Sequence, residues 1–203
     1  FPGVNDWDTL DADRVRGYVG AVTAVSNLQV ATGLLAFCCE RQPLTVLDCS
    51  WLTNLKTVEA FYSSVKSASF QGCAALRRCC LESTGARTNW RVVGGMRIED
   101  EVLDLRDSPL LQDIRGTNDD RTGIRLHPGA LATLWHLCIM ENSRLTGIWL
   151  GEDTTPLTDL RGFRMLKECW ISGSRVVPSL VVTNGVTDSI MATGCGLTNL
   201  DLQ

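Results

Sequence analysis

Few residues in this chain are of the types that perform chemistry. The 203 residues include nine cysteines but only two histidines, His127 and His136. No CxxC spacing occurs, so a zinc site has little support. The motifs GxSxG, HExxH, GxGxxG and the P-loop are also missing. We therefore predict no catalytic residue, no metal and no cofactor, and expect a protein that is not an enzyme.

Tryptophan is the stronger candidate for a functional role. The chain contains six tryptophans, and this residue type is enriched at the centres of binding surfaces. A partner can reach an indole only where it points outward and is not covered by another segment. The elements that carry the tryptophans must therefore be identified first.

The hydrophobic pattern identifies these elements. The frame h-x-x-h-x-h, where h is apolar, occurs in fourteen segments that begin at residues 23, 34, 44, 55, 65, 76, 100, 111, 134, 145, 166, 177, 186 and 197. Each odd-numbered segment starts 11 residues before the next one, whereas the other steps vary from 9 to 24. Successive side chains of a strand point to opposite faces, so each frame predicts a short strand with its h residues inside.

These strands predict a right-handed parallel β-solenoid, a β-rich and leucine-rich-repeat-like fold. About seven coils with two short parallel strands each should stack, because a lone coil cannot bury its apolar side. The odd and even segments should form two separate sheets. Small or polar residues, such as Cys73 and Ser108, occupy the middle of most corners, and Leu52 departs from this pattern. Ile148 is an h position and is expected in the core.

Three stretches resemble leucine-rich repeats. The runs LTVLDCSWLTNLKTVEA at 44–60 and LWHLCIMENSRLTGIWL at 134–150 look like the short bacterial form L-x-x-L-x-C/L-x-x-N-x-L. The run FQGCAALRRCCL at 70–81 is similar to a phrase in surface repeat proteins of Bacteroidetes and spirochaetes. The resemblance covers roughly 23–203. It implies a corner residue that hydrogen-bonds the turn of its neighbour, although the asparagine ladder of the family is mostly missing here.

A terminal cap and three insertions complete the chain. Residues 1–22 are predicted to form a helical N-terminal cap, and the solenoid of 23–203 carries insertions at 82–99, 117–133 and 151–165. The first insertion predicts a β-hairpin around Gly94-Gly95. The second and third predict short helices that begin near Pro128 and Pro156. No cap follows the last strand, which predicts possible end-to-end self-association at the C-terminal strand.

The repeat register separates the cysteines. The inward positions are Cys39, Cys49, Cys79 and Cys169, the outward positions are Cys38, Cys80 and Cys138, and Cys73 and Cys195 lie in corners. Cys38 and Cys80 share a position but stand two coils apart, about 9–10 Å, which is beyond disulfide reach. We therefore predict no disulfide within the chain.

Two outward tryptophans on neighbouring coils form the predicted binding site. Trp135 and Trp170 should line one shallow patch, with His136 and Lys167 as polar contacts at its edge; these four residues are named the tryptophan patch. The competing interpretation is that insertions cover the outward tryptophans, and we expect this for at least two of Trp90, Trp135, Trp149 and Trp170.

The pattern favours a non-enzymatic recognition module that binds a protein or glycan through a sheet face or the insertions, at the cell surface or outside the cell. The alternative is a structural repeat segment of a larger surface, filament or phage-fibre assembly. A net charge of −4 with mixed signs does not favour a nucleic-acid partner. No apolar run approaches the roughly 18 residues of a membrane span.

Overall fold

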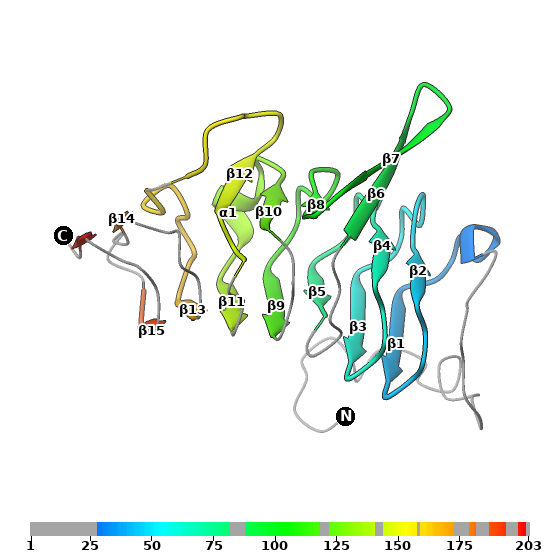
Figure 1. Ribbon diagram of the computed structural model, residues 1–203, viewed down its shortest axis with the longest axis horizontal. Helices are drawn as coiled ribbons and strands as arrows, with labels where there is room; N and C mark the ends of the chain where they lie inside the picture. The colour runs from blue at the N-terminus through cyan, green and yellow to red at the C-terminus, as the bar shows by residue number, and fades with distance from the viewer. Residues whose placement is uncertain are drawn as a thin grey trace.

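The computed structural model describes residues 28–81, 88–117, 122–140, 144–157, 159–172, 179–181, 187–193 and 199–201. The chain forms a parallel β-solenoid of about six turns with almost no helix (Figure 1). A short 3₁₀ turn, η2 (Leu28–Val30), precedes the first strand. The predicted helical cap at 1–22 lies outside the described residues.

One side of the solenoid is a single continuous sheet, named here the long sheet. Its seven parallel strands follow in the order β1-β3-β5-β9-β11-β13-β15. Their bounds are β1 (Ala36–Glu40), β3 (Thr57–Phe61), β5 (Arg78–Cys80), β9 (Asp113–Thr117), β11 (His136–Met140), β13 (Glu168–Ser172) and β15 (Ser189–Thr193).

The opposite side, named here the second face, is broken into three sheets. Their strand orders are β2-β4-β6-β7, β12-β10-β8 and β14-β16. The bounds are β2 (Val46–Asp48), β4 (Ser67–Ser69), β6 (Thr88–Val93), β7 (Met96–Asp100), β8 (Val102–Leu105), β10 (Gly123–Leu126), β12 (Gly147–Leu150), β14 (Ser179–Val181) and β16 (Asn199–Asp201).

The core lies between the two sides and consists of stacked rows of h residues. One row of the long sheet runs through aligned residues that are each no more than 1% exposed: Val58, Cys79, Ile114, Leu137 and Cys169. A fully buried apolar side chain of this size contributes roughly 1.5–3 kcal/mol relative to exposure. Because each coil repeats this contribution, the stack is stabilised by contacts between neighbouring coils.

The predicted strand pairing is confirmed in part. Segments 44–49 and 65–70 are neighbouring parallel strands, with Leu47 opposite Ala68. The predicted division into odd and even sheets is wrong after segment 111–116. That segment forms β9, and its neighbour in the long sheet is β11, which comes from segment 134–139.

An additional strand in the second insertion causes this change. Strand β10 lies within 117–133 and fills the second face between β8 and β12. Its sequence, TGIRL at 122–126, differs at one position from TGIWL at 146–150, and the two runs align residue for residue, with Gly123 opposite Gly147. The repeated pentapeptide is the sequence signal that identifies β10.

The first insertion forms the predicted hairpin and also a strand of the second face. Strands β6 and β7 are antiparallel, and Gly94-Gly95 joins Val93 to its partner Met96. Both glycines have positive φ, which a two-residue hairpin turn requires. Strand β6 also pairs parallel with β4. Among the described strands, β6 and β7 are the only antiparallel pair, as predicted.

Polar side chains fix the base of the hairpin. The buried Asn89 amide donates to the Ala68 carbonyl at 2.9 Å and accepts from the Asp104 N–H at 3.1 Å, so it joins β4 to β8 across β6. Arg91 forms ion pairs with Asp104 and Asp107, each at 3.2 Å. The hairpin is therefore attached to the coils on both sides of it.

Only one of the two predicted helical turns forms. Helix α1 (Ala130–Thr133) follows Pro128 as expected. The helix predicted at Pro156 is wrong, because this segment returns over β12 instead. The Leu157 N–H donates to the Ile148 carbonyl at 2.6 Å, and Pro156 lies against Gly147. These contacts need an extended chain, which a helical turn would not provide.

Corner residues join neighbouring coils by hydrogen bonds. The Cys73 thiol donates to the Cys49 carbonyl at 3.0 Å, and the Ser108 hydroxyl donates to the Cys73 carbonyl at 3.1 Å. Both side chains are buried, as is Leu52, the apolar exception in this position. The small polar corner residues thus satisfy turn carbonyls that would otherwise be buried without a donor.

Candidate functional site on the outer face of the long sheet

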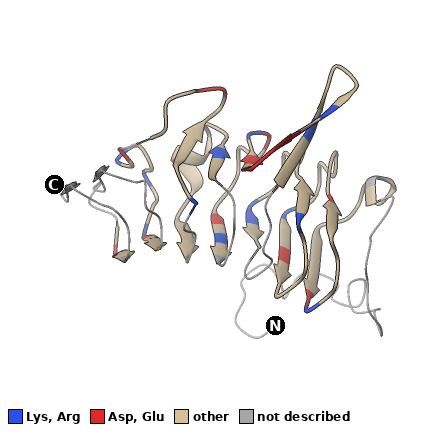
Figure 2. Ribbon diagram, viewed as in Figure 1, with Lys and Arg blue, Asp and Glu red and all other residues tan. Residues whose placement is uncertain are grey.

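Polar and charged side chains form a row across the outer face of the long sheet. Four consecutive strands contribute aligned residues to this row: Arg78, Asp113, His136 and Glu168. Figure 2 shows acidic and basic residues on the neighbouring strands β3, β5 and β9. The strand register places the acidic residues of this row beside basic residues on adjacent strands. Opposite charges in such directly opposed positions attract one another and stabilise the sheet.

Asp113 is the centre of this row. It is 3% exposed, and its carboxylate accepts from His136 Nδ1 at 2.6 Å and from Arg115 Nε at 3.2 Å. Arg78 Nε lies 3.3 Å from its other oxygen and 3.0 Å from Glu59. Burial alone would raise the pKa of Asp113, but the His136 hydrogen bond and the arginine charges outweigh burial and lower it.

His136 is held between this carboxylate and two indoles. Its ring stacks on Trp135 with centroids 5.4 Å apart, and it meets Trp170 edge-on at 5.7 Å. Its Nε2 lies 3.5 Å from a Glu168 oxygen and has no aligned hydrogen-bond partner. His136, predicted as a polar contact at the edge of the patch, is 2% exposed, because the indoles cover it and Asp113 holds it against the sheet.

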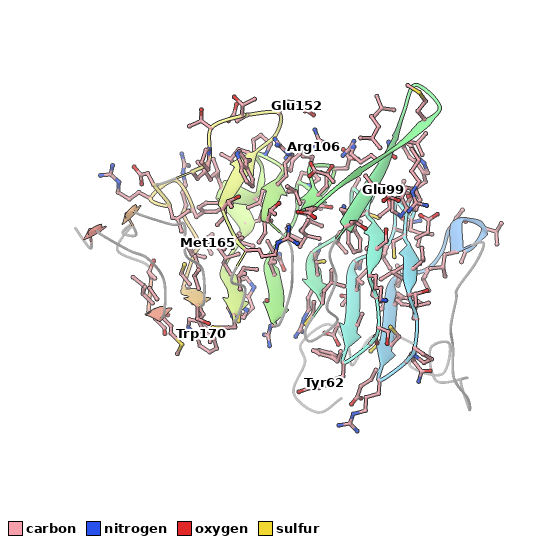
Figure 3. All side chains as sticks on the ribbon, in the orientation of Figure 1. Tyr62, Glu99, Arg106, Glu152, Met165 and Trp170 are labelled. Atoms are coloured by element: carbon pink, nitrogen blue, oxygen red, sulfur yellow. The ribbon has the colours of Figure 1, made fainter. Side chains whose placement is uncertain are left out.

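The other predicted patch residues lie around this histidine. Trp135 and Trp170 are half-buried, and Lys167 is exposed. The Lys167 N–H donates to the Trp135 carbonyl at 2.8 Å, and Trp170 Nε1 donates to Ser189 Oγ at 3.1 Å. Figure 3 shows Trp170 on β13. The structure therefore brings all four residues of the tryptophan patch together, with two indoles partly open to solvent.

Of the other two tryptophans in the predicted set of four, Trp90 is buried, whereas Trp149 is half-buried like Trp135 and Trp170. Trp90 is 8% exposed, with the Arg97 guanidinium 4.5 Å above its ring. Trp149 lies against Gly123, where an added Cβ would stand 2.0 Å from the ring. Arg125 covers the same indole at 5.7 Å. Both tryptophans pack within their own part of the second face.

The outward cysteines occupy the row beside the charged residues. Along that row the order is Cys38, Glu59, Cys80, Arg115 and Cys138, so a charged residue separates each pair of thiols. The structure has no disulfide among the eight described cysteines, and Cys195 lies outside the described residues. Burial and the nearby Glu59 charge raise the pKa of Cys38 to about 12, which keeps this thiol protonated at neutral pH.

The sequence did not indicate the charged residues that hold His136. Asp113, Arg115 and Glu168 stand at x positions of the frame, where polar residues are ordinary, and only the strand register places them beside His136. Within the described segments, no three His, Cys, Asp or Glu side chains are grouped so that they could hold a metal ion. The arrangement is suited to hold two indoles in fixed positions at a charged rim.

Among the described helices, none has the length and apolar character needed to cross a membrane. Comparison of the chain with protein-family models, curated proteins and solved structures gives no match.

Proposed function

We propose that this chain is a non-enzymatic recognition module, a leucine-rich-repeat-type solenoid at the cell surface or outside the cell, that binds a protein or glycan through the tryptophan patch. The observation that carries the proposal is the pair of half-buried indoles held around the buried His136–Asp113 pair. Exposed aromatic rings are the side chains on which sugars stack and around which protein interfaces form.

Rigid support for the indoles favours this function. Trp170 lies on β13, and Trp135 immediately precedes the adjacent strand β11; adjacent strands are about 4.8 Å apart. His136 contacts both rings, and Asp113 holds the histidine at 2.6 Å. A side chain that is already fixed before binding loses less conformational entropy in the complex. Lys167 and Glu168 lie at the rim, where they can select a partner by charge.

The state of His136 supports a non-enzymatic function. A general base must reach the proton that it removes. His136 is 2% exposed, and Nε2, the ring nitrogen that the Asp113 bond leaves open, is itself buried. These contacts favour an orienting role for the histidine over proton transfer. The structural alternative, a segment of a larger surface or fibre assembly, is favoured by the exposed strand β7 and would need no ligand at the tryptophan patch.

Binding to immobilised ligands tests the proposal. We expect the wild-type chain to bind members of a glycan array or of an array of extracellular protein domains, and the array that responds identifies the partner class. Trp170→Ala should weaken that binding by roughly 1–2 kcal/mol, about five- to thirtyfold, with little loss of stability.

Trp149→Ala is the matched control, because it removes an indole from the second face. This variant should lower the melting temperature and leave binding unchanged. Equal binding by wild type and Trp170→Ala would contradict the proposal, as would a response to neither array.

A further inference from the structure

The hairpin carries an edge strand that is open along its whole length. It rises away from the coils (Figure 1). Strand β7 is the last strand of its sheet, and all five of its residues are exposed. The apolar ones are prominent, with Met96 69% and Ile98 51% exposed, and Val93 on β6 is 53% exposed. An exposed apolar edge of this kind can pair with another strand.

The hydrogen bonds of β6 show which backbone groups β7 leaves open. The Val92 N–H donates to the Gln71 side-chain oxygen at 2.8 Å, and the Val92 carbonyl accepts from the same amide at 2.9 Å. Val92 therefore points its backbone groups away from β7. Arg97 stands opposite Val92, so in an antiparallel ladder its N–H and C=O point away from β6. Backbone directions alternate along a strand, so the N–H and C=O of Glu99, two residues further on, also point away from β6.

We propose that β7 pairs antiparallel with β7 of a second copy of this chain, about a twofold axis at Ile98. Arg97 of one copy stands opposite Glu99 of the other and exchanges two backbone hydrogen bonds with it. Ile98 then faces the partner's Ile98 as a non-hydrogen-bonded pair. The two sheets of β2-β4-β6-β7 join into one continuous sheet across the contact.

The charges on β7 select this register. In the proposed register each Arg97 faces Glu99 of the other copy. The twofold axis therefore produces two pairs of opposite charge, one on each side of Ile98. A shift of the axis to Arg97 or to Glu99 would place two arginines or two glutamates directly opposite each other, which is destabilising. Figure 2 shows this separation, with basic charge toward the hairpin tip and acidic charge toward its base.

The other side of β7 supplies the apolar part of the contact. Ile98, Met96 and Val93 share one face, because side chains alternate along a strand and Val93 is the partner of Met96. In the paired form the two Ile98 side chains meet and remove their exposed surface from water. The same patch is used identically by both copies, as a closed twofold contact requires.

The hairpin base limits how far this edge can move. Arg91 is tied to Asp104 and Asp107, and Gln71 is bonded to Val92 on both backbone groups. The strand is thus held at a fixed angle to the solenoid before any partner arrives. One strand edge is a small contact, so the dimer should form and dissociate reversibly with concentration.

Charge exchange tests the register. Sedimentation velocity over a concentration series should show a reversible wild-type dimer. Arg97→Glu alone and Glu99→Arg alone should each be monomeric, because each puts like charges opposite one another. An equimolar mixture of the two variants should restore a dimer, and so should the double variant Arg97→Glu/Glu99→Arg. Each single variant also loses the 2.6 Å ion pair between Arg97 and Glu99 of its own strand, and mixing the variants does not restore that pair, so a dimer in the mixture cannot be attributed to a repaired hairpin.

A single cysteine tests the position of the axis. Opposed residues of a non-hydrogen-bonded pair have Cα atoms about 4.5 Å apart, which suits a disulfide. Oxidised Ile98→Cys should therefore run as a covalent dimer on a non-reducing gel. Met96→Cys lies on the same face, but its copies would be roughly 13 Å apart and should remain uncrosslinked, like the wild type.

The proposal is overturned if the wild type stays monomeric at all concentrations. It is also overturned if both single charge variants still dimerise, which would place the contact on another surface, such as the C-terminal strand. Crosslinking of Met96→Cys but not of Ile98→Cys would reject the register.

Discussion

The long sheet and the second face differ in whether inserted segments interrupt them. The long sheet keeps seven strands in one uninterrupted order, whereas the second face is divided into three sheets. Strand β5 is the direct neighbour of β9 in the long sheet, although the hairpin and β8 lie between them in sequence. The described strands of that stretch, β6, β7 and β8, belong to the second face, where β6 joins β4 and the hairpin extends outward.

This difference follows from what each side presents to its neighbours. The long sheet carries a buried ionic row whose members need the adjacent strands as partners, so an inserted strand would separate Asp113 from Arg78. On the second face, outward side chains pack locally, as Trp149 does on two glycines of its own sheet. Continuity is therefore required on one side only, and the other side can accept new segments.

The largest expected effect concerns the core that both sides share. Ile148→Ala on β12 should lower the free energy of unfolding by roughly 2–5 kcal/mol, because the side chain is 4% exposed and its removal leaves a cavity. Leu137→Ala on β11 should cost a similar amount. Urea unfolding of both variants measures this. A change below about 1 kcal/mol in Ile148→Ala alone would show that the second face contributes little to the core.

The next effect should be confined to the long sheet. Asp113→Asn keeps the shape of the side chain but removes the charge that His136, Arg115 and Arg78 share. Hydrogen bonds to a charged group contribute roughly 1.5–3 kcal/mol each, so we expect a loss of about that size at pH 6. The measurement is again urea unfolding, now at pH 6 and at pH 3.

The pH dependence has a defined direction. Because the folded-state pKa of Asp113 is lowered from 3.8, its stabilisation is fully present above that value and is lost as pH falls through the folded pKa. The difference between wild type and Asp113→Asn should therefore shrink at pH 3. Asp159→Asn is the control: its carboxylate pairs with Arg161 and its pKa is also lowered, but it is exposed, so little change is expected at either pH. If the free energies of unfolding of wild type and Asp113→Asn differ by the same amount at pH 6 and pH 3, Asp113 stabilises the fold through packing and not through its charge.

The sequence predicts the repeat better than the connections between repeats. The h-x-x-h-x-h frame identifies the strands because inward residues must be apolar in every coil, and the Gly94-Gly95 turn identifies the hairpin. The frame identifies a strand but does not say which sheet the strand joins. Strand β11 joins the long sheet because β10 takes the preceding place on the second face, and the frame misses β10 because polar residues flank it. For the site, outward position identifies the indoles, but the burial of His136 depends on Asp113, which lies 23 residues away in sequence.

A third prediction tests the local packing of the second face. Gly123→Ala should destabilise by roughly 1–3 kcal/mol, because the new Cβ would lie 2.0 Å from the Trp149 ring and 2.7 Å from the Gly147 carbonyl. Gly33→Ala is the matched control, since nothing lies within 4 Å of its added Cβ and no positive φ is required there. It should be neutral or slightly stabilising. Thermal unfolding measures both, and equal behaviour would show that the indole can move away freely.

The smallest effect is expected from reducing agents, and it tests the register of the long sheet. Cys38, Cys80 and Cys138 lie on alternate strands of one row, about 9–10 Å apart, and disulfide formation needs Cα atoms within about 7 Å. Dithiothreitol should therefore leave the melting temperature unchanged, and thiol titration in denaturant should find all nine cysteines free. In the native state Cys38 should react slowly at neutral pH, because burial and Glu59 raise its pKa to about 12. Loss of two thiols from the titration would contradict the prediction that no two cysteines of the chain are joined.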